Sequence, residues 1–164
     1  MNNIVLCGFM GCGKSTVGRL LAKSLGRVFI DTDEYIENEQ NMTVSEIFEQ
    51  YGESGFRDIE HKACVNLAKK SGFVIATGGG ALTFERNAAA FADDRVIFMN
   101  VPFDEIERRI DGGNSRPLFQ DRNKALELYN IRLPLYKKAA DCTVDAVGST
   151  QTVARKIAEI IEVK

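Results

Sequence analysis

The segment Gly8–Ser15 constrains the fold of this chain more than any other part of its sequence. Its residues, GFMGCGKS, fit the P-loop pattern G-x-x-x-x-G-K-[ST]. An apolar run, Ile4–Cys7, precedes it, and residues 16–25 follow with apolar side chains at helical spacing. The pattern therefore joins a predicted buried strand to the N-terminus of a predicted helix, where backbone N–H groups and the helix dipole favour an anion.

We interpret this segment as a phosphate-binding loop rather than as a plain glycine turn, because both flanking elements are present. Lys14 would then reach the outer phosphates of a nucleotide, and the Ser15 hydroxyl would take one coordination position on Mg²⁺. The motif alone leaves open a kinase, a nucleotide switch or a motor, so the reaction must be inferred from the rest of the chain.

The bulk composition limits the number of domains and the kinds of partner. The chain has 164 residues, which suffices for one domain with a core but not for two. Its net charge of −2 provides no overall attraction for nucleic acid or for an anionic membrane, so we expect neither as a partner, and we expect a monomer. No basic leader or long apolar segment precedes the first predicted strand, which favours a cytoplasmic location.

The cysteines and the histidine show no metal-binding pattern. The four cysteines form no C-x-x-C pair, and they do not cluster with His61, the single histidine. We therefore predict no zinc site, free thiols, and a His61 side chain on the surface of a helix.

Predicted strands alternate with predicted helices along the chain. The strands are continuously apolar rather than alternating, which is typical of a parallel sheet covered by helices on both faces. Ligands of such sheets bind at the carboxyl ends of the strands, where the P-loop, Asp31–Asp33, Gly78–Gly80 and the segment after Val101 would meet. The predicted strands are residues 4–7, 27–31, 73–77, 95–101 and 141–145, and the later helices are residues 34–39, 43–51, 56–70, 84–91, 103–110, 122–133 and a last one capped by Ser149 or Thr150.

Two aspartates, Asp31 and Asp33, stand at the end of the second predicted strand. Residues two positions apart lie on the same side of an extended backbone. One carboxylate beside the P-loop could hold Mg²⁺ directly or through water, and the other could accept a proton from a substrate hydroxyl. Capping of the next helix by Asp33 is the alternative, but two aspartates at this place favour a functional pair.

Arg57 and Glu60 lie one helical turn apart. Their spacing does not decide between a solvent-exposed ion pair and two groups that jointly line a pocket. By periodicity, we expect Phe48 and Phe56 in the core.

Three consecutive glycines, Gly78–Gly80, follow a predicted buried strand. This is more than a tight turn requires, and backbone without side chains allows close approach of a ligand to several N–H groups. Arg116 follows a glycine-rich loop and precedes a proline, which suits either a mobile cation that reaches the phosphates or a solvated charge. Arg132, in a predicted helix that ends near Pro134, could bind an anion or be exposed.

Together these motifs resemble the shikimate kinase family, a group of small P-loop kinases. The resemblance covers essentially the whole chain in the family's order. The matching segments are Gly8–Thr16, Asp31-x-Asp33, Phe56-Arg57-x-x-Glu60, Gly78–Gly80, Arg116-Pro117-Leu118 and Arg132-x-x-Leu135-Tyr136.

The resemblance implies both a fold and a reaction. The fold is α/β, a three-layer α/β/α P-loop fold with a five-stranded parallel sheet in the order 2-3-1-4-5. One kinase domain, residues 1–164, would contain a substrate-binding helical segment at about 33–62 and a mobile lid at about 111–123. The reaction is transfer of the γ-phosphoryl group of ATP to the 3-hydroxyl of shikimate, on the pathway to chorismate and the aromatic amino acids, with ATP and Mg²⁺ as cofactors.

The resemblance also implies roles for individual residues on the nucleotide side. Asp31 would assist Ser15 at the metal through water. Arg116 would be the lid arginine that closes over the transferring phosphoryl group. Arg109 is the candidate for stacking on adenine, with Arg108 as the alternative, and a further adenine contact would fall near residues 147–149. The residues expected to hold ATP through its phosphates are Gly11, Cys12, Gly13, Lys14, Ser15 and Thr16.

On the acceptor side, the resemblance implies that Asp33 orients the attacking hydroxyl. Arg57 and Arg132 would clamp the shikimate carboxylate, which suits the planar fork of a guanidinium group. Glu60 would fix Arg57. The backbone at Gly78, Gly79 and Gly80 would contact the substrate, and the catalytic residues would be Lys14, Asp33 and Arg116.

Two rival functions remain at this point. One is another small-molecule kinase of the same architecture, such as a gluconate or nucleoside-monophosphate kinase. The other is a guanine-nucleotide switch, which needs a late N-K-x-D motif; the nearest string, Asn123–Leu126, lacks the aspartate.

Overall fold

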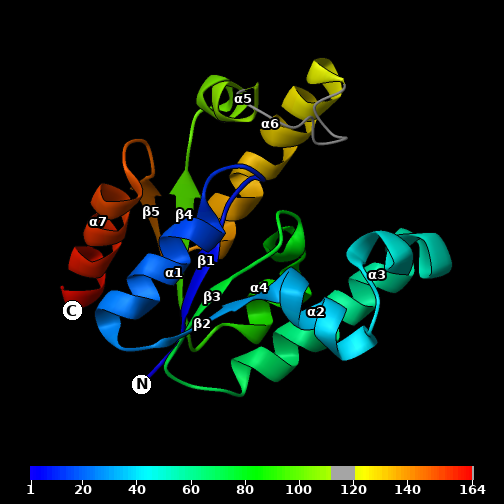
Figure 1. The fold of residues 1–164 in the computed structure, drawn as a ribbon, viewed down its shortest axis with the longest axis horizontal. Coiled ribbons are helices and arrows are strands. Elements are labelled where there is room, and N and C mark those ends of the chain that lie inside the picture. Colours follow the sequence, from blue (N-terminus) through cyan, green and yellow to red (C-terminus); the bar gives the residue numbers. More distant parts are fainter. Residues whose placement is uncertain (112–120, 164) are drawn as a thin grey trace.

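Five parallel strands form the centre of the fold (Figure 1). The computed structural model describes residues 1–111 and 121–163. Its strands are β1 (Ile4–Cys7), β2 (Val28–Asp31), β3 (Phe73–Ala76), β4 (Arg95–Asn100) and β5 (Cys142–Asp145). Their order in the sheet is β2-β3-β1-β4-β5, so the predicted fold class and strand order are confirmed.

Helices cover both faces of this sheet. In Figure 1, α1 packs beside α7 on one face, and α6 packs against β4 from the other. The helices are α1 (Lys14–Leu25), α2 (Thr32–Gln40), α3 (Val44–Ala68), α4 (Glu85–Ala90), α5 (Phe103–Asp111), α6 (Arg122–Ala139) and α7 (Thr150–Glu162), with a short 3₁₀ turn, η1 (Ala81–Thr83), before α4. Among the described helices, none is long and apolar enough to cross a membrane.

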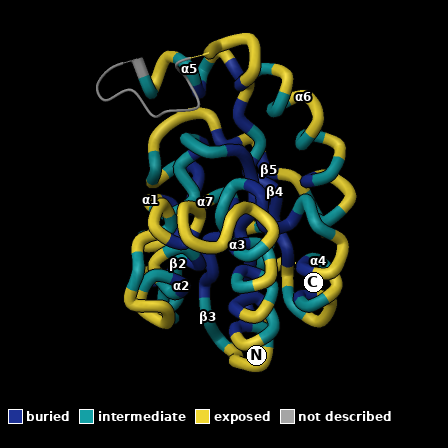
Figure 2. Tube along the Cα trace, turned by 90° about the vertical axis from the view of Figure 1, so that its right-hand side faces the viewer, coloured by how far each residue is buried: buried dark blue, intermediate teal, exposed yellow. Residues whose placement is uncertain are grey.

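Burial follows the position of each strand in the sheet (Figure 2). The central strand β1 is buried at all four positions, because it lies between β3 and β4 and has helices on both faces. At the edge, β2 is only partly covered, and Val28 is 59% exposed. The continuously apolar sequence of β1 is thus the consequence of burial on two sides.

The helix α6 continues past the point at which the sequence predicts its end. We expected it to end near Pro134, because proline has no N–H to donate to the carbonyl four residues earlier. It runs to Ala139 instead. Tyr136, on the turn after the proline, is buried and stacks on Phe98 of β4 with ring centroids 5.3 Å apart. This tertiary packing outweighs the one missing hydrogen bond.

The helix α3 joins the two helices that we predicted at residues 43–51 and 56–70. It bends at Gly52, whose φ of 70° and ψ of −179° are not helical. Phe56 is buried as predicted, but Phe48 is partly exposed, so its assignment to the core is wrong. The rings of Phe48 and Phe56 stack 4.5 Å apart at the border of a small second hydrophobic cluster. That cluster is made of Ile36, Ile47, Phe56 and Ala63.

The cysteines are free thiols as predicted, whereas the environment of His61 differs from the prediction. All four cysteines are free thiols. Burial raises the pKa of Cys7 and of Cys64 to about 12, so both thiols stay protonated. His61 is not simply a surface residue: it is half-buried, and its Nδ1 lies 2.8 Å from Oδ1 of Asn87.

Leu21 of α1 tests how much the main core contributes to stability. Its side chain is fully buried, and Leu21→Ala should lower the free energy of unfolding by about 2–5 kcal/mol, because it removes apolar contacts and leaves a cavity. Urea unfolding followed by circular dichroism measures this loss. The control is Val163→Ala at an exposed position, which should change the free energy by less than about 0.5 kcal/mol. Equal effects of the two substitutions would contradict the assignment of the core.

Candidate active site

The P-loop connects β1 to α1 in the predicted position. Gly13, immediately before the first residue of α1, has a φ of 92°, and Gly8 has a φ of 152°. Both conformations favour glycine. A Cβ on Gly8 would also lie 2.8 Å from the carbonyl oxygen of Met99, so the loop passes close to the end of β4. The loop therefore brings the N-terminus of α1 to the carboxyl edge of the sheet.

The Lys14 side chain folds over this loop. Its Nζ donates hydrogen bonds to the carbonyl oxygens of Gly8 at 2.7 Å and Phe9 at 3.1 Å. Cys12 Sγ lies 3.6 Å from the same nitrogen. These contacts hold a positive charge at the loop, where it can act on a bound anion.

Ser15 and Asp31 form a pair of oxygen donors beside the loop. The Ser15 hydroxyl donates to Asp31 Oδ2 at 2.6 Å. The other carboxylate oxygen of Asp31 accepts the N–H groups of Asp33 at 2.9 Å and Glu34 at 3.3 Å, which makes Asp31 the N-cap of α2. The capping role that we considered for Asp33 therefore belongs to Asp31. A hydroxyl and a carboxylate are ligands that suit Mg²⁺.

Asp33 lies against the first glycine after β3. A Cβ on Gly78 would stand 2.9 Å from Asp33 Oδ1 and 3.4 Å from Glu60 Oε2. The Gly78 N–H donates to the Thr32 hydroxyl at 2.8 Å, which ties the end of β2 to the end of β3. Burial, reinforced by the nearby Asp31 carboxylate, raises the pKa of Asp33 above its usual range.

Arg57 and Glu60 form a buried pair rather than a solvent-exposed one. Arg57 Nη1 lies 2.9 Å from Glu60 Oε1, and their side chains are 14% and 1% exposed. Burial raises the pKa of Glu60, although the Arg57 guanidinium acts in the opposite direction. The structure thus decides the question that spacing left open: the two groups line the interior of the site.

The guanidinium groups of Arg57 and Arg132 converge on Gly80. A Cβ on Gly80 would lie 2.8 Å from Arg57 Nη2 and 3.0 Å from Arg132 Nη2. Within the described residues, Arg57 Nε and Arg132 Nη1 are buried and have no hydrogen-bond partner. Two like charges with unused donors, one from α3 and one from α6, form a site for a planar anion such as a carboxylate.

At the other side of the P-loop lies a cavity of about 570 Å³. Arg109 of α5 lines this cavity. Its Nη1 donates to the carbonyl oxygen of Cys12 at 3.4 Å, and its Nη2 donates to that of Ala146 at 3.3 Å. Arg108 also borders the cavity, but its side chain is 75% exposed and is paired with Glu105. Of the two candidate arginines, only Arg109 bonds the P-loop. The cavity is lined by Gly11–Gly13, Thr16, Val17, Glu105, Arg108, Arg109, Ala146–Thr150 and Val153.

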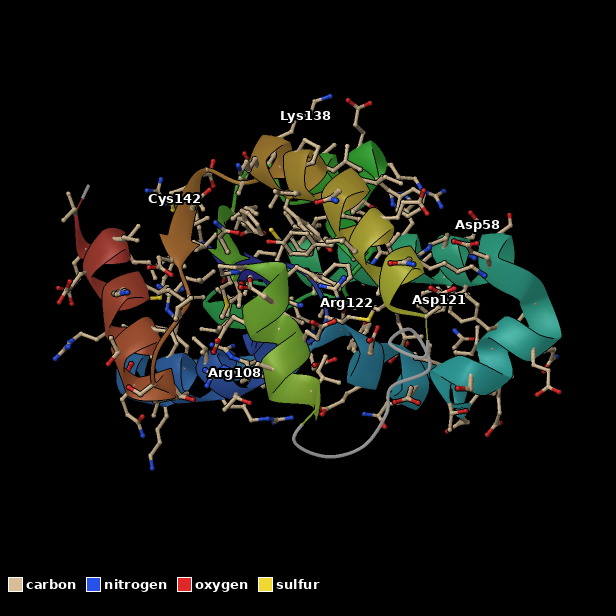
Figure 3. The ribbon with its side chains drawn as sticks, turned by 90° about the horizontal axis from the view of Figure 1, so that it is seen from above. Asp58, Arg108, Asp121, Arg122, Lys138 and Cys142 are labelled. Atoms are coloured by element: carbon tan, nitrogen blue, oxygen red, sulfur yellow. The ribbon has the colours of Figure 1, made fainter. Side chains whose placement is uncertain are left out.

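Figure 3 looks onto this end of the molecule, with α5 in front of the sheet and α3 at one side. The predicted lid arginine, Arg116, and most of the lid, residues 112–120, lie outside the described residues. The other predicted site residues surround the carboxyl ends of β1, β2 and β3.

Three residues whose side chains bond the glycine segment, Gly78–Gly80, had no predicted role. The Thr83 hydroxyl donates to the Gly80 carbonyl at 2.6 Å. Thr32 accepts the Gly78 N–H, and the Tyr136 hydroxyl donates to the Gly79 carbonyl. Tyr136 follows Arg132 by one helical turn, a spacing that places the two side chains on one face of a helix. That spacing was the available signal for Tyr136. Thr32 offered none, because in the sequence it only separates the two aspartates that carried the predictions.

Comparisons with known proteins agree with one another. A family model described as shikimate kinase matches residues 10–162. A shikimate kinase of Thermodesulfovibrio yellowstonii is 45% identical over 162 residues, which cover 96% of this chain and 93% of that protein.

Solved structures agree as well. A shikimate kinase from Acinetobacter baumannii in complex with shikimate has a TM-score of 0.89 at 38% identity, and the match covers 99% of this chain and 93% of that one. A shikimate kinase from Bacteroides thetaiotaomicron has a TM-score of 0.90 at 31% identity, and the match covers 99% of both chains. The similarity therefore extends over the whole described fold.

Asp33 provides a test of the electrostatics of the site. Because its pKa is raised in the folded protein, the folded state binds the proton more tightly than the unfolded chain does, and ionisation lowers stability as the pH rises through the raised pKa. Asp33→Asn should therefore raise the melting temperature at pH 7. The gain should shrink as the pH falls towards about 4, where the unfolded carboxyl also becomes protonated.

Thermal unfolding at several pH values measures this effect. Asp58→Asn, at an exposed carboxylate, is the matched control and should change the melting temperature little at any of them. A lower melting temperature for Asp33→Asn at pH 7 would contradict the assignment.

Proposed function

The chain belongs to the shikimate kinase family, and from this membership we propose how its active site works. The reaction of the enzyme is transfer of the γ-phosphoryl group of ATP to the 3-hydroxyl of shikimate, which yields shikimate 3-phosphate. The observation that carries the choice of acceptor is the pair of guanidinium groups that converge on Gly80, each with a buried and unpartnered nitrogen, with Asp33 close to Gly78. A carboxylate and a hydroxyl on one small molecule match these groups.

At the acceptor end, we propose that Arg57 and Arg132 bind the shikimate carboxylate. The unpartnered Nε of Arg57 and Nη1 of Arg132 supply donors for it. Glu60 holds the Arg57 guanidinium in place through the bond at 2.9 Å. Asp33 binds the ring hydroxyls and orients the one that attacks, while the N–H groups of the glycine segment contact the substrate.

At the nucleotide end, the backbone of the P-loop and Lys14 bind the ATP phosphates. Ser15 and Asp31 would hold Mg²⁺, and the metal would supply positive charge to neutralise the ATP phosphates. Arg109 and the adjoining cavity take the adenine ring. Arg116 supplies a further cation to the transferring group.

The proposed catalysis consists of positioning and charge stabilisation. The transition state of phosphoryl transfer is largely loose, so the protein has little covalent chemistry to perform. Asp33 therefore contributes by orienting the hydroxyl rather than by strong base catalysis. Lys14 and Arg116 stabilise the charge on the phosphate oxygens.

Several further features belong to the proposal. The segment at about 33–62, with its own small hydrophobic cluster, binds the substrate, and the segment at about 111–123 acts as the lid of a single domain spanning residues 1–164. The enzyme works as a cytoplasmic monomer without nucleic acid or membrane partners.

A coupled ADP-release assay tests the choice of acceptor. Turnover with shikimate, Mg²⁺ and ATP, and none without shikimate, is the expected result. Gluconate serves as the competing acceptor, since it also carries a carboxylate and hydroxyl groups. Turnover with gluconate and none with shikimate would overturn the proposal.

The two arginines proposed to bind the shikimate carboxylate, Arg57 and Arg132, form what we call the carboxylate clamp. Substitutions of these arginines test it. Arg132→Ala should weaken shikimate binding by about 10- to 100-fold, because a charge-assisted hydrogen bond contributes about 1.5–3 kcal/mol. Arg57→Lys keeps the charge beside Glu60 but loses the planar fork, so it should weaken binding in the same direction. Isothermal titration with shikimate measures both.

The control for the clamp is Arg86→Ala. Arg86 forms a surface pair with Asp58 at 3.0 Å, and both side chains are largely exposed. This variant should bind shikimate like the parent chain. Unchanged affinity in both clamp variants would remove the clamp from the proposal.

Arg116→Ala separates phosphoryl transfer from acceptor binding. We expect a fall in kcat of about 100-fold or more, since a cation on the transferring group acts mainly in the transition state. Shikimate affinity should stay close to that of the parent chain. Steady-state kinetics together with titration measure the two quantities, and a normal kcat would refute the role.

A further inference from the structure

Hydroxyl groups hold the carbonyls of the glycine segment from two sides. The Tyr136 hydroxyl donates to the Gly79 carbonyl, and the Thr83 hydroxyl donates to the Gly80 carbonyl at 2.6 Å. Within residues 1–111 and 121–163, the N–H groups of Gly79 and Gly80 donate no hydrogen bond. Each rigid peptide plane contains the carbonyl of one residue and the N–H of the next, so the Tyr136 bond fixes the direction of the Gly80 N–H, and the Thr83 bond fixes that of the Ala81 N–H. The Ala81 N–H in turn donates to the Gly78 carbonyl at 3.0 Å, and that carbonyl shares its peptide plane with the Gly79 N–H. The Gly80 N–H is thus fixed directly by Tyr136 and the Gly79 N–H through Ala81, and both donors are unused.

Tyr136 is itself held rigidly. It is 1% exposed, and its ring stacks on Phe98 of β4 with an interplanar angle of 27°. Burial raises the pKa of Tyr136 well above its usual range, so the hydroxyl keeps the proton that it donates. The bond to Gly79 is thus made from a fixed ring with a permanent donor.

The same helix carries Arg132 to the same glycines. A Cβ on Gly79 would lie 3.6 Å from Arg132 Nη1, and one on Gly80 would lie 3.0 Å from Arg132 Nη2. Tyr136 stands one helical turn further along α6. Its bond to Gly79 therefore fixes the distance between the Arg132 guanidinium and the two unused N–H groups.

We propose that Tyr136 and Thr83 are positioning residues for the acceptor: the Tyr136 hydroxyl orients the Gly80 N–H and keeps Arg132 in register with it, and the Thr83 hydroxyl holds the Gly79 N–H through the bond from Ala81 to Gly78. The proposal rests on the proposed function, because it takes the acceptor of that reaction as the ligand of these amides. Neither hydroxyl needs to touch the substrate, since each acts through the backbone carbonyl that it holds.

Tyr136→Phe and Thr83→Val test the proposal, because each removes a hydroxyl and keeps most of the side chain's shape. Each should raise the KM for shikimate by about 3- to 30-fold, the range expected for a lost or unsatisfied buried hydrogen bond. The KM for ATP should stay within about twofold of the parent value. Titration with shikimate should show the same loss of affinity as the KM.

Tyr129→Phe is the matched control. The Tyr129 hydroxyl, also on α6, donates to the Val101 carbonyl at 2.8 Å. Removing it therefore breaks a hydrogen bond of the same kind as that of Tyr136, but one that does not involve the glycine segment. It should lower the melting temperature as Tyr136→Phe does, but leave the KM for shikimate unchanged. If Tyr136 contributes only to stability, Tyr136→Phe and Tyr129→Phe should show the same melting temperature change and the same unchanged KM for shikimate.

The possible results separate the two proposals. No turnover of shikimate by the parent chain would refute the proposed function. If the parent chain turns over shikimate but folded Tyr136→Phe has an unchanged KM for shikimate, the Tyr136 hydroxyl has no positioning role. The same result for folded Thr83→Val would overturn the role of the Thr83 hydroxyl. Should Tyr136→Phe fail to fold, Thr83→Val alone still tests whether fixing these carbonyls matters to the acceptor.

Discussion

The parallel pairing of β1 with β3 on one side and β4 on the other determines where all the chemistry of this chain lies. Because the strands run in the same direction, the segments that follow them leave the sheet at one edge. The P-loop follows β1, Asp31 ends β2, and the glycine segment follows β3. Residues far apart in the sequence therefore meet without any long loop. The hydrogen bond from Gly78 to Thr32 fastens two of these strand ends to each other.

The site holds more charge than its own residues neutralise. The Arg57–Glu60 pair is buried, Asp33 lies close to Asp31, and the donors Arg57 Nε and Arg132 Nη1 are unpaired within the described chain. Buried charge of this kind destabilises a fold unless a partner compensates it. A ligand that carries a carboxylate and hydroxyl groups supplies the missing partners. In the proposed function, binding of such a ligand compensates these buried groups.

Much of this could be predicted from the sequence, because local signals report local structure. The P-loop, the buried strands and the Ser149 cap of α7 depend on neighbouring residues and were confirmed. The errors concern tertiary packing. Pro134 is a local signal for a helix end, but the packing of Tyr136 on β4 overrides it. Likewise, spacing places Arg57 beside Glu60, but only the fold shows that the pair is buried.

Two glycines of the site are constrained for different reasons, and this difference matters for the evolution of the family. A side chain on Gly8 would meet the backbone oxygen of Met99, which cannot move without disturbing β4. The nearest atoms that a side chain on Gly80 would meet are the guanidinium nitrogens of Arg57 and Arg132, which belong to the site and not to the sheet. The first glycine is therefore required by the fold, and the second by the proposed binding of the acceptor. If the proposed acceptor site is correct, we expect a descendant that acquires a side chain at position 80 to keep its fold and to lose room for the present acceptor.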